Sequence, residues 1–262
     1  MLALILIAGH STRMGQDKAL ILRLDGQRQI DHLAAITRAA GLEPWLSMRD
    51  DDSPPPLDLP VIRDRHPGAG PLAALDAFHH AHPGEPVLLL GADLFLLDVA
   101  TLRVLLEQRD PSRMATAFAN RLDSKPEPLC TIFEASAIPQ ASEWLARGEP
   151  RARHFLRSLD PKVIALPHPA ALDNINTLID LAEAFAKLQH GAVAKTIHLE
   201  HPAFTGSFDT LACTIGGVFS ELCFLKRLDP IPSNFRPVLD GQPALWGQLI
   251  PPGGHIAFQP AS

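Results

Sequence analysis

Short apolar runs alternate with longer amphipathic segments over most of the chain. The runs have the length of buried strands, and the amphipathic segments have the period of helices. The strands are predicted at 2–7, 44–48, 61–63, 86–91, 114–119, 129–134 and 162–166. The helices are predicted near 28–41, 71–82, 98–109, 138–147, 151–159 and 177–188, with Gly41 as the C′ glycine of the first. This alternation predicts an α/β fold with a mostly parallel sheet and helices on both faces.

The pattern changes after Leu188. Residues 195–200 alternate like an edge strand, 216–228 have the pattern of one helix, and two further strands are predicted at 236–239 and 255–258, separated by turns rich in glycine and proline. This stretch is long enough for a small domain. We therefore expect two domains, an α/β domain at 1–189 and a small α+β domain at 193–262.

Composition and charge limit the possible partners. The chain has 262 residues and a formal net charge of -6, which argues against a nucleic-acid or membrane surface because both partners favour a basic face. The first apolar run lacks a basic n-region and is too short for a signal peptide or a membrane helix of roughly 20 residues. We expect a cytoplasmic protein. The cysteines, Cys130, Cys213 and Cys223, form no C-x-x-C pair and are expected to be buried apolar residues.

The segment AGHSTRMGQDK, residues 8–18, leaves the first predicted strand at its carboxyl end, where ligands bind in open parallel sheets. Glycines let the backbone approach a bulky anion, hydroxyl groups donate hydrogen bonds, and cations supply charge. The residues of these kinds are Gly9, Ser11, Arg13, Gly15 and Lys18. The spacing differs from that of a Walker A loop or a dinucleotide-binding glycine motif. The alternative is a surface turn with incidental cations.

The stretch IAGHSTRMGQDKAL, residues 7–20, resembles the L-A-G-G-x-S-x-R-M-G-x-D-K signature of molybdenum cofactor guanylyltransferases, which are nucleotidyltransferases with a Rossmann-like fold. The resemblance implies that the loop surrounds a nucleoside triphosphate and that Arg13 and Lys18 lie on its phosphates as catalytic residues. This chain has one residue fewer before the serine and lacks the second glycine. The family's contact with the base is therefore not carried over.

Three later segments follow the family's order. VIRDRHPGAGPLAAL (61–75) resembles the segment that lines the nucleobase and ribose side of the pocket. VLLLGADLFLLD (87–98) resembles the strand that ends in a magnesium-binding aspartate, which implies that Asp93 is catalytic and holds Mg²⁺. DNINTLIDLAEA (173–184) resembles the segment that faces the pterin or the metal. The implied binding residues are Leu6, Ile7, Ala8, Gly9, Ser11, Gly15, Lys18, Ser47, Asp64, Gly70, Pro71, Leu72, Asn174 and Asn176.

Ordinary structural roles are the alternatives for several of these residues. A carboxylate after a buried strand is costly unless it is paired or binds a metal, and Asp93 lies too far upstream to cap the helix that begins near Asp98. Asp64 has a turn or an ion pair as its alternative. Asn174 and Asn176 have capping of the helix that begins at 177, which we expect to explain at least one of them.

The implied reaction transfers GMP from GTP to molybdopterin and releases pyrophosphate. A cytidylyltransferase acting on the same pterin, a sugar-phosphate nucleotidyltransferase and a non-catalytic scaffold in cofactor synthesis are the alternatives. The C-terminal sequence RPVLDGQPALWGQLIPPGGHIAFQP resembles the closing strands of β-grasp sulfur carriers, but this chain does not end in the Gly-Gly of those carriers. We therefore expect a β-grasp-like module that docks other molybdenum cofactor synthesis proteins or guides the substrate.

Overall fold

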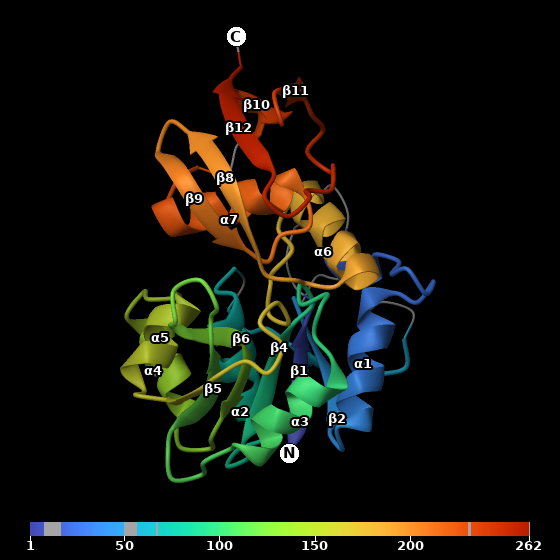
Figure 1. Ribbon diagram of the computed structural model, residues 1–262. Coiled ribbons are helices and arrows are strands. Elements are labelled where there is room, and N and C mark those ends of the chain that lie inside the picture. The colour runs from blue at the N-terminus through green and yellow to red at the C-terminus, as the bar shows by residue number, and fades with distance from the viewer. Residues whose placement is uncertain (8–16, 50–56, 67, 230–231, 262) are drawn as a thin grey trace. The chain divides into compact units, whose positions relative to one another are not determined.

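The computed structural model describes residues 1–7, 17–49, 57–66, 68–229 and 232–261 (Figure 1). The chain divides into two compact units, Met1–Leu172 and Asp173–Ser262. No helix among the described residues is long and apolar enough to cross a membrane.

The first unit is built on a seven-stranded sheet in the order β3-β2-β1-β4-β6-β5-β7. Its strands are β1 (Leu2–Leu6), β2 (Glu43–Met48), β3 (Val61–Arg63), β4 (Val87–Gly91), β5 (Ala115–Ala119), β6 (Pro126–Phe133) and β7 (Lys162–Ile164). Only β6 runs antiparallel to its neighbours, β4 and β5. The mostly parallel sheet expected from the sequence is confirmed.

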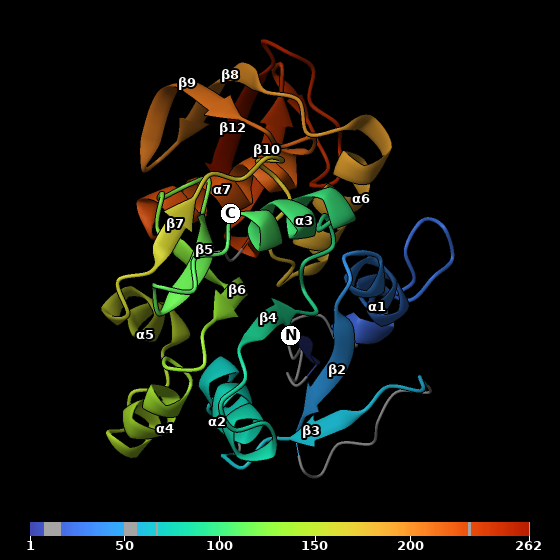
Figure 2. The same ribbon diagram turned by 90° about the horizontal axis from the view of Figure 1, so that it is seen from below.

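Helices cover both faces of this sheet, as expected (Figure 2). The helices are α1 (Gln29–Ala39), α2 (Pro71–Ala81), α3 (Val99–Glu107), α4 (Pro139–Ala146) and α5 (Ala152–Ser158). Alternate residues of β1 enter opposite cores: Ala3 and Ile5 pack with α1 and α3, whereas Leu4 packs with α2. Both faces of the central strands are therefore buried, which explains their continuous apolar sequences.

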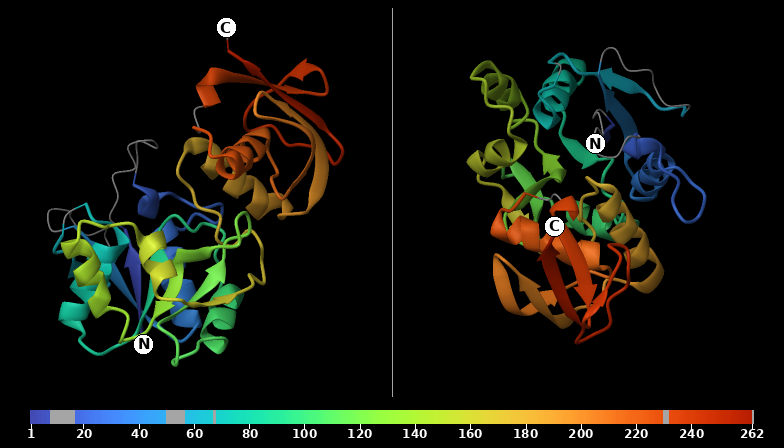
Figure 3. Two further views of the ribbon diagram at one scale, coloured as in Figure 1. Left: turned by 90° about the vertical axis from the view of Figure 1, so that its left-hand side faces the viewer. Right: turned by 90° about the horizontal axis from the view of Figure 1, so that it is seen from above.

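The second unit contains α6 (Leu178–His190), α7 (Ile215–Lys226) and a five-stranded sheet in the order β11-β10-β12-β8-β9 (Figure 3). Its strands are β8 (Lys195–His201), β9 (Phe204–Thr210), β10 (Phe235–Leu239), β11 (Gln242–Pro243) and β12 (His255–Pro260). The neighbours β8 and β12 are parallel, and the other pairs are antiparallel. The prediction of an edge strand at 195–200 was wrong, because β9 pairs with the free side of β8. The β-grasp likeness stays a prediction.

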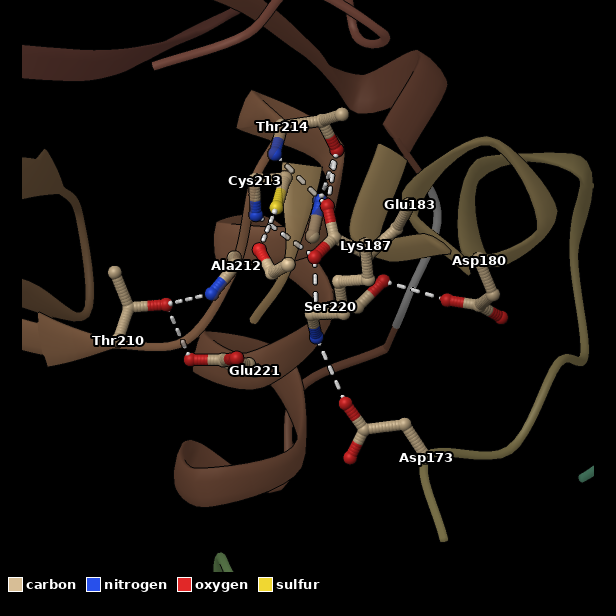
Figure 4. Close-up of polar contacts among 12 residues, drawn as sticks. Asp173, Asp180, Glu183, Lys187, Thr210, Ala212, Cys213, Thr214, Ser220 and Glu221 are labelled. Carbon is tan, nitrogen blue, oxygen red and sulfur yellow. Dashed lines mark hydrogen bonds and ion pairs between the residues drawn. The ribbon is translucent and has the colours of Figure 1, made fainter. Parts of the chain in front are cut away.

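The boundary between the compact units lies before α6, whereas the sequence placed this helix in the first domain. Its Glu183 carboxylate accepts hydrogen bonds from the backbone amides of Cys213 and Thr214, at 2.8 Å each, at the start of α7 (Figure 4). Lys187, one turn along α6, lies 3.0 Å from Glu183 and 2.8 Å from Asp173. A charged network therefore joins α6 to α7.

Two glycines let these helices approach closely. A Cβ atom on Gly217 would collide with the Glu183 carboxylate, and one on Gly216 would collide with the side chain of Ile179. Thr214 caps α7 by accepting a hydrogen bond from the Gly217 amide at 3.0 Å. The start of α7 is thus shaped to receive α6, which explains why α6 packs with the second unit.

Candidate active site

The site begins where the chain reverses its direction of travel across the sheet. From β1 the chain adds β2 and β3 on one side, and then β4 on the other, so the carboxyl ends of β1 and β4 lie side by side. The strands stay hydrogen-bonded to each other up to this edge. The Ile7 amide donates to Ser47 O and the Ala92 amide donates to Leu6 O, both at 3.1 Å. The predicted contacts Leu6, Ile7 and Ser47 therefore gather at this switch point, the usual place for a ligand in open α/β sheets.

Lys18 and Asp93 meet at this edge. Lys18 opens the 3₁₀ helix η1 (Lys18–Leu20), whose start is fixed because the Asp17 side chain accepts a hydrogen bond from the Ala19 amide at 2.9 Å. Nζ of Lys18 lies 3.9 Å from Oδ2 of Asp93, and both side chains are largely buried. The structure therefore brings together two of the three predicted catalytic residues.

The Asp93 carboxylate is only partly compensated. Its Oδ1 atom is buried and has no hydrogen-bond partner among the described residues. Burial raises the pKa of Asp93, the charge of Lys18 lowers it, and the nearby charge of Glu127 raises it further. An anionic oxygen without a donor in an apolar strand end is costly, and a divalent cation would offset that cost. The residue therefore fits a Mg²⁺ site, since Mg²⁺ takes oxygen ligands from one or two carboxylates and substrate phosphates.

Gly91 makes room for this carboxylate. A Cβ atom added to Gly91 would collide with Oδ1 of Asp93 and would lie 3.1 Å from Cδ1 of Leu129. The last residue of β4 therefore has to be small for the side chain of Asp93 to take this position. Sequence reasoning missed this role of Gly91, although the glycine stands between an apolar run and Asp93 in the sequence LLLGAD.

Glu127 was also missed. It lies on β6, which pairs with β4, and its carboxylate is buried. Oε2 of Glu127 accepts a hydrogen bond from Arg153 at 2.6 Å and one from Asn120 at 3.3 Å. The buried charge is thus paired, and it contributes to the electrostatic environment of Asp93. Only the antiparallel pairing of β6 with β4 brings Glu127 near, and the sequence pattern did not predict that pairing.

Ser47 and Asp64 form a second pair at the same edge. The Ser47 hydroxyl donates a 2.8 Å hydrogen bond to Oδ1 of Asp64, and the Asp64 amide donates to Met48 O at 2.7 Å. Both residues are buried. The backbone of Asp64 thus continues the pairing of β3 with β2, and its carboxylate lies at the ligand-binding edge of the sheet.

The GPL segment starts α2. Gly70 has a φ of 59°, which disfavours other residues, and Pro71 occupies the first turn, where its missing N–H leaves no gap in the helix. The side chain of Leu72 is fully buried in the core against the sheet. Leu72 can therefore line a ligand site only through its backbone.

Known proteins resemble this chain over the same region. Residues 3–163 match the MobA-like NTP transferase domain. The chain belongs to this family. A probable molybdenum cofactor guanylyltransferase of Carboxydothermus hydrogenoformans is 33% identical over 183 residues, covering 67% of this chain and 90% of the relative. The molybdenum cofactor guanylyltransferase of Rhizobium johnstonii is 32% identical, covering 69% of this chain and 89% of the relative.

Solved structures share the fold of this MobA-like chain. The molybdopterin-guanine dinucleotide biosynthesis protein A of Archaeoglobus fulgidus superposes with a TM-score of 0.60 at 19% identity, covering 72% of this chain and 99% of that protein. A nucleotidyl transferase of Methanothermobacter thermautotrophicus gives 0.54 at 20% identity, covering 68% of this chain and 93% of that protein. The Rossmann-like expectation is confirmed.

Part of the predicted phosphate-binding loop is not described by the structure. Ala8, Gly9, Ser11, Arg13 and Gly15 lie outside the described residues, and their roles stay predictions.

Asn174 and Asn176 belong to the second unit. The expectation that one of them caps α6 was wrong. The cap is Thr177, whose hydroxyl accepts from the Asp180 amide while the Asp180 carboxylate accepts from the Thr177 amide. A capping box of this kind leaves both asparagine side chains out of the cap. Their contact with a substrate stays a prediction.

The three cysteines are buried, as expected, and are free thiols. Burial raises the pKa of each thiol, to about 11 for Cys223. Thiols of this kind are poor nucleophiles and poor metal ligands at neutral pH. None of the three cysteines is therefore a candidate nucleophile or metal ligand.

Proposed function

We propose that this protein is a guanylyltransferase that joins GMP from GTP to molybdopterin. An oxygen of the terminal phosphate of molybdopterin attacks the α-phosphorus of GTP, the bond from this phosphorus to the bridging oxygen breaks, and pyrophosphate leaves. Membership of the MobA-like family supports nucleotidyl transfer. The names of the relatives support the guanylyl group and the pterin.

The single observation that carries this proposal is the pairing of Lys18 with Asp93 at the switch point. Phosphate transfer needs little covalent chemistry from a protein, but it needs charge stabilisation and alignment. Lys18 would stabilise the triphosphate and the leaving pyrophosphate, and Arg13 is proposed to assist it. Asp93 would hold Mg²⁺, which when bound neutralises phosphate charge.

The remaining residues would bind and orient the nucleotide. Ser47 and Asp64 form a fixed polar pair beside the ends of β1 and β2, where the ribose or base would lie. The glycine-containing segment after β1 is proposed to surround the phosphates through its amides. In this proposal Lys18 and Asp93 stabilise charge, and residues at the neighbouring strand ends recognise the nucleotide.

Binding of nucleotides tests the proposal directly. GTP with Mg²⁺ at a hundred times its dissociation constant should add about 2.7 kcal/mol to the free energy of unfolding. CTP with Mg²⁺ should add much less, and stabilisation by CTP instead of GTP would favour the cytidylyl alternative. No stabilisation by any nucleotide would favour the scaffold. Mass spectrometry of the product formed from GTP and molybdopterin then identifies the dinucleotide, whereas a sugar-phosphate product would overturn the pterin assignment.

The second unit is proposed to be a β-grasp-like module that docks other molybdenum cofactor synthesis proteins or guides the pterin. The match to the family ends at residue 163, and the two relatives named above cover 67% and 69% of this chain. A cytoplasmic location is part of the same proposal. Pull-down of cofactor-synthesis proteins by the full chain, compared with a variant in the exposed Leu245, would test the docking role.

A further inference from the structure

The outer face of the second sheet carries two imidazoles and one carboxylate side by side. The alternation of β8 places His198 and Glu200 on its exposed face, while Ile197, Leu199 and His201 point to the core. His255 opens β12, the parallel neighbour of β8, and is the register partner of His198. One strand thus supplies two side chains of the group, and its neighbour supplies the third.

The backbone fixes the positions of these side chains. The His198 amide donates to Gly254 O at 3.0 Å, directly before His255. The His255 amide donates to Oδ1 of Asp240 at 2.8 Å, and the Asp240 amide donates to His255 O at 2.8 Å. Both histidines are therefore held by the ladder and its flanking turn, so that only side-chain torsions have to adjust to a ligand.

The three polar groups converge. One ligand atom from each of His198, Glu200 and His255 lies within 4.8 Å of the other two. Two ligands on one tetrahedral Zn²⁺ ion lie about 3.3–3.5 Å apart, given bonds of roughly 2.0–2.1 Å. The three side chains therefore have to rotate about their torsions to bring their ligand atoms to this separation.

We propose that His198, Glu200 and His255 bind a divalent transition-metal ion of the Zn²⁺ type. Two imidazoles and one carboxylate are a ligand set that suits Zn²⁺, whereas Mg²⁺ prefers oxygen ligands alone. Three protein ligands leave a fourth position for water or for a group from a partner. This site is chemically distinct from the all-oxygen site proposed at Asp93.

The state of His255 supports a metal site over a simple surface ion pair. Its Nε2 atom lies 3.1 Å from Oε1 of Glu200, but the two atoms do not have hydrogen-bond geometry. Nε2 is buried and has no hydrogen-bond partner among the described residues. The ring of His198 lies 4.9 Å from that of His255, between centroids, and is tilted by 40°. A cation between the three groups would satisfy Nε2, which the carboxylate alone does not.

Equilibrium dialysis of the untagged, full-length protein against Zn²⁺ tests the proposal. Mg²⁺ is kept in excess and Asp93 is replaced by asparagine, so that the other candidate cation site does not contribute. We expect one Zn²⁺ per chain, and weaker binding at acidic pH because protons compete for imidazoles. His198→Ala and His255→Ala should each weaken binding by at least about tenfold, the lower bound found even for residues that only support metal ligands.

Matched controls separate this site from general binding to surface histidines. His168→Ala removes an exposed histidine of the first unit and should leave Zn²⁺ affinity unchanged. Glu200→Gln should also weaken Zn²⁺ binding, and Glu143→Gln, at another exposed glutamate, is its control and should leave the affinity unchanged. Co²⁺ should give a ligand-field absorption spectrum that disappears in the His198→Ala/His255→Ala double variant. Absence of Zn²⁺ binding by the parent chain, or equal affinity in the parent chain and in both single histidine variants, would overturn the proposal.

Discussion

The ammonium nitrogen of Lys18 lies 3.9 Å from Oδ2 of Asp93, where strands β1 and β4 end side by side. The two residues are distant in sequence, and the order of strands alone makes them neighbours. At this distance they attract each other without a direct hydrogen bond. The pair is therefore suited to admit a charged ligand between or beside its members.

Replacement of Lys18 tests the role of its charge. Lys18→Ala should lower turnover by at least about a hundredfold, the scale of losing one preorganised electrostatic stabiliser. The measurement is pyrophosphate release from GTP with molybdopterin present. Lys162→Ala is the control, because Lys162 bonds to the backbone of Gln108 on the surface, and it should keep normal turnover. Normal turnover in Lys18→Ala would remove this lysine from the mechanism.

We expect the buried charge of Asp93, which is proposed to serve catalysis, to lower the free energy of unfolding. Because burial raises its pKa, the folded chain retains a proton on Asp93 at pH values where the unfolded chain has lost it. The free energy of unfolding therefore falls as pH rises from the ordinary pKa through the raised one, and the loss is complete above it.

Asp93→Asn removes that loss. Without divalent cations at neutral pH, its melting temperature should exceed the parent's, because asparagine has no charge to bury. The difference should close at acidic pH, where Asp93 is protonated, and turnover should fall by about a hundredfold. Melting curves between pH 4 and 8 test this, since the window begins near the ordinary aspartate pKa of about 4. A variant less stable than the parent at neutral pH would contradict the assignment.

Gly91→Ala should displace the Asp93 carboxylate. The added methyl group would collide with Oδ1 of Asp93 and press on Leu129, at a cost of about 1–3 kcal/mol in the free energy of unfolding. Activity and Mg²⁺-dependent nucleotide binding should both fall. Gly247→Ala is a clean control, because nothing lies within 4 Å of the added atom. Equal activity in the two variants would show that the carboxylate position is not critical.

Ser47→Ala should weaken nucleotide binding. The hydroxyl fixes one oxygen of Asp64, and its loss should cost about 1 kcal/mol, or roughly fivefold in KM for GTP. Ser158→Ala loses a comparable hydrogen bond, to Phe155 O, away from the strand ends. Steady-state kinetics should therefore show a raised KM in the first variant and an unchanged KM in the second. A KM raised equally in both would indicate a general loss of stability.

Glu183→Gln should loosen the second unit. The carboxylate pairs with Lys187 and accepts from two amides at the start of α7. Its loss should cost about 1.5–3 kcal/mol, the scale of hydrogen bonds to a charged group, because the buried Lys187 keeps its ion pair with Asp173. Hydrogen exchange of residues 211–224 should speed up markedly. The exposed Glu143→Gln is the control and should exchange like the parent. Unchanged protection in Glu183→Gln would show that the network does not hold α7.

Much of the first unit was predictable because its signals are local. Apolar runs in the sequence predict buried strands. Gly41, with a φ of 83°, follows the end of α1 as expected. Lys18 and Asp93 were found because each follows a strand whose carboxyl end reaches the ligand-binding edge. The resemblance to a known family supplied their roles, since composition and periodicity alone could not.

The features that the sequence analysis missed depend on contacts between residues that are far apart in the sequence. Glu127 reaches Asp93 only through the antiparallel placement of β6, and β9 was overlooked because Gly206 interrupts an otherwise alternating strand. The cap of α6 was assigned to Asn174 or Asn176, although the adjacent threonine and Asp180 form a complete capping box. Local sequence offers several chemically plausible caps, and only the geometry selects one.

The bonds from α6 to the start of α7 restrict how this chain can be recombined. A cut between α6 and β8 would leave one piece with the carboxylate of Glu183 and the ammonium of Lys187 projecting into water. The other piece would carry, at the start of α7, two backbone amides that have lost their acceptor. Gene fusion, fission or module exchange that preserves the C-terminal unit therefore has to fall upstream of Asp173, within the stretch that resembles the transferase family.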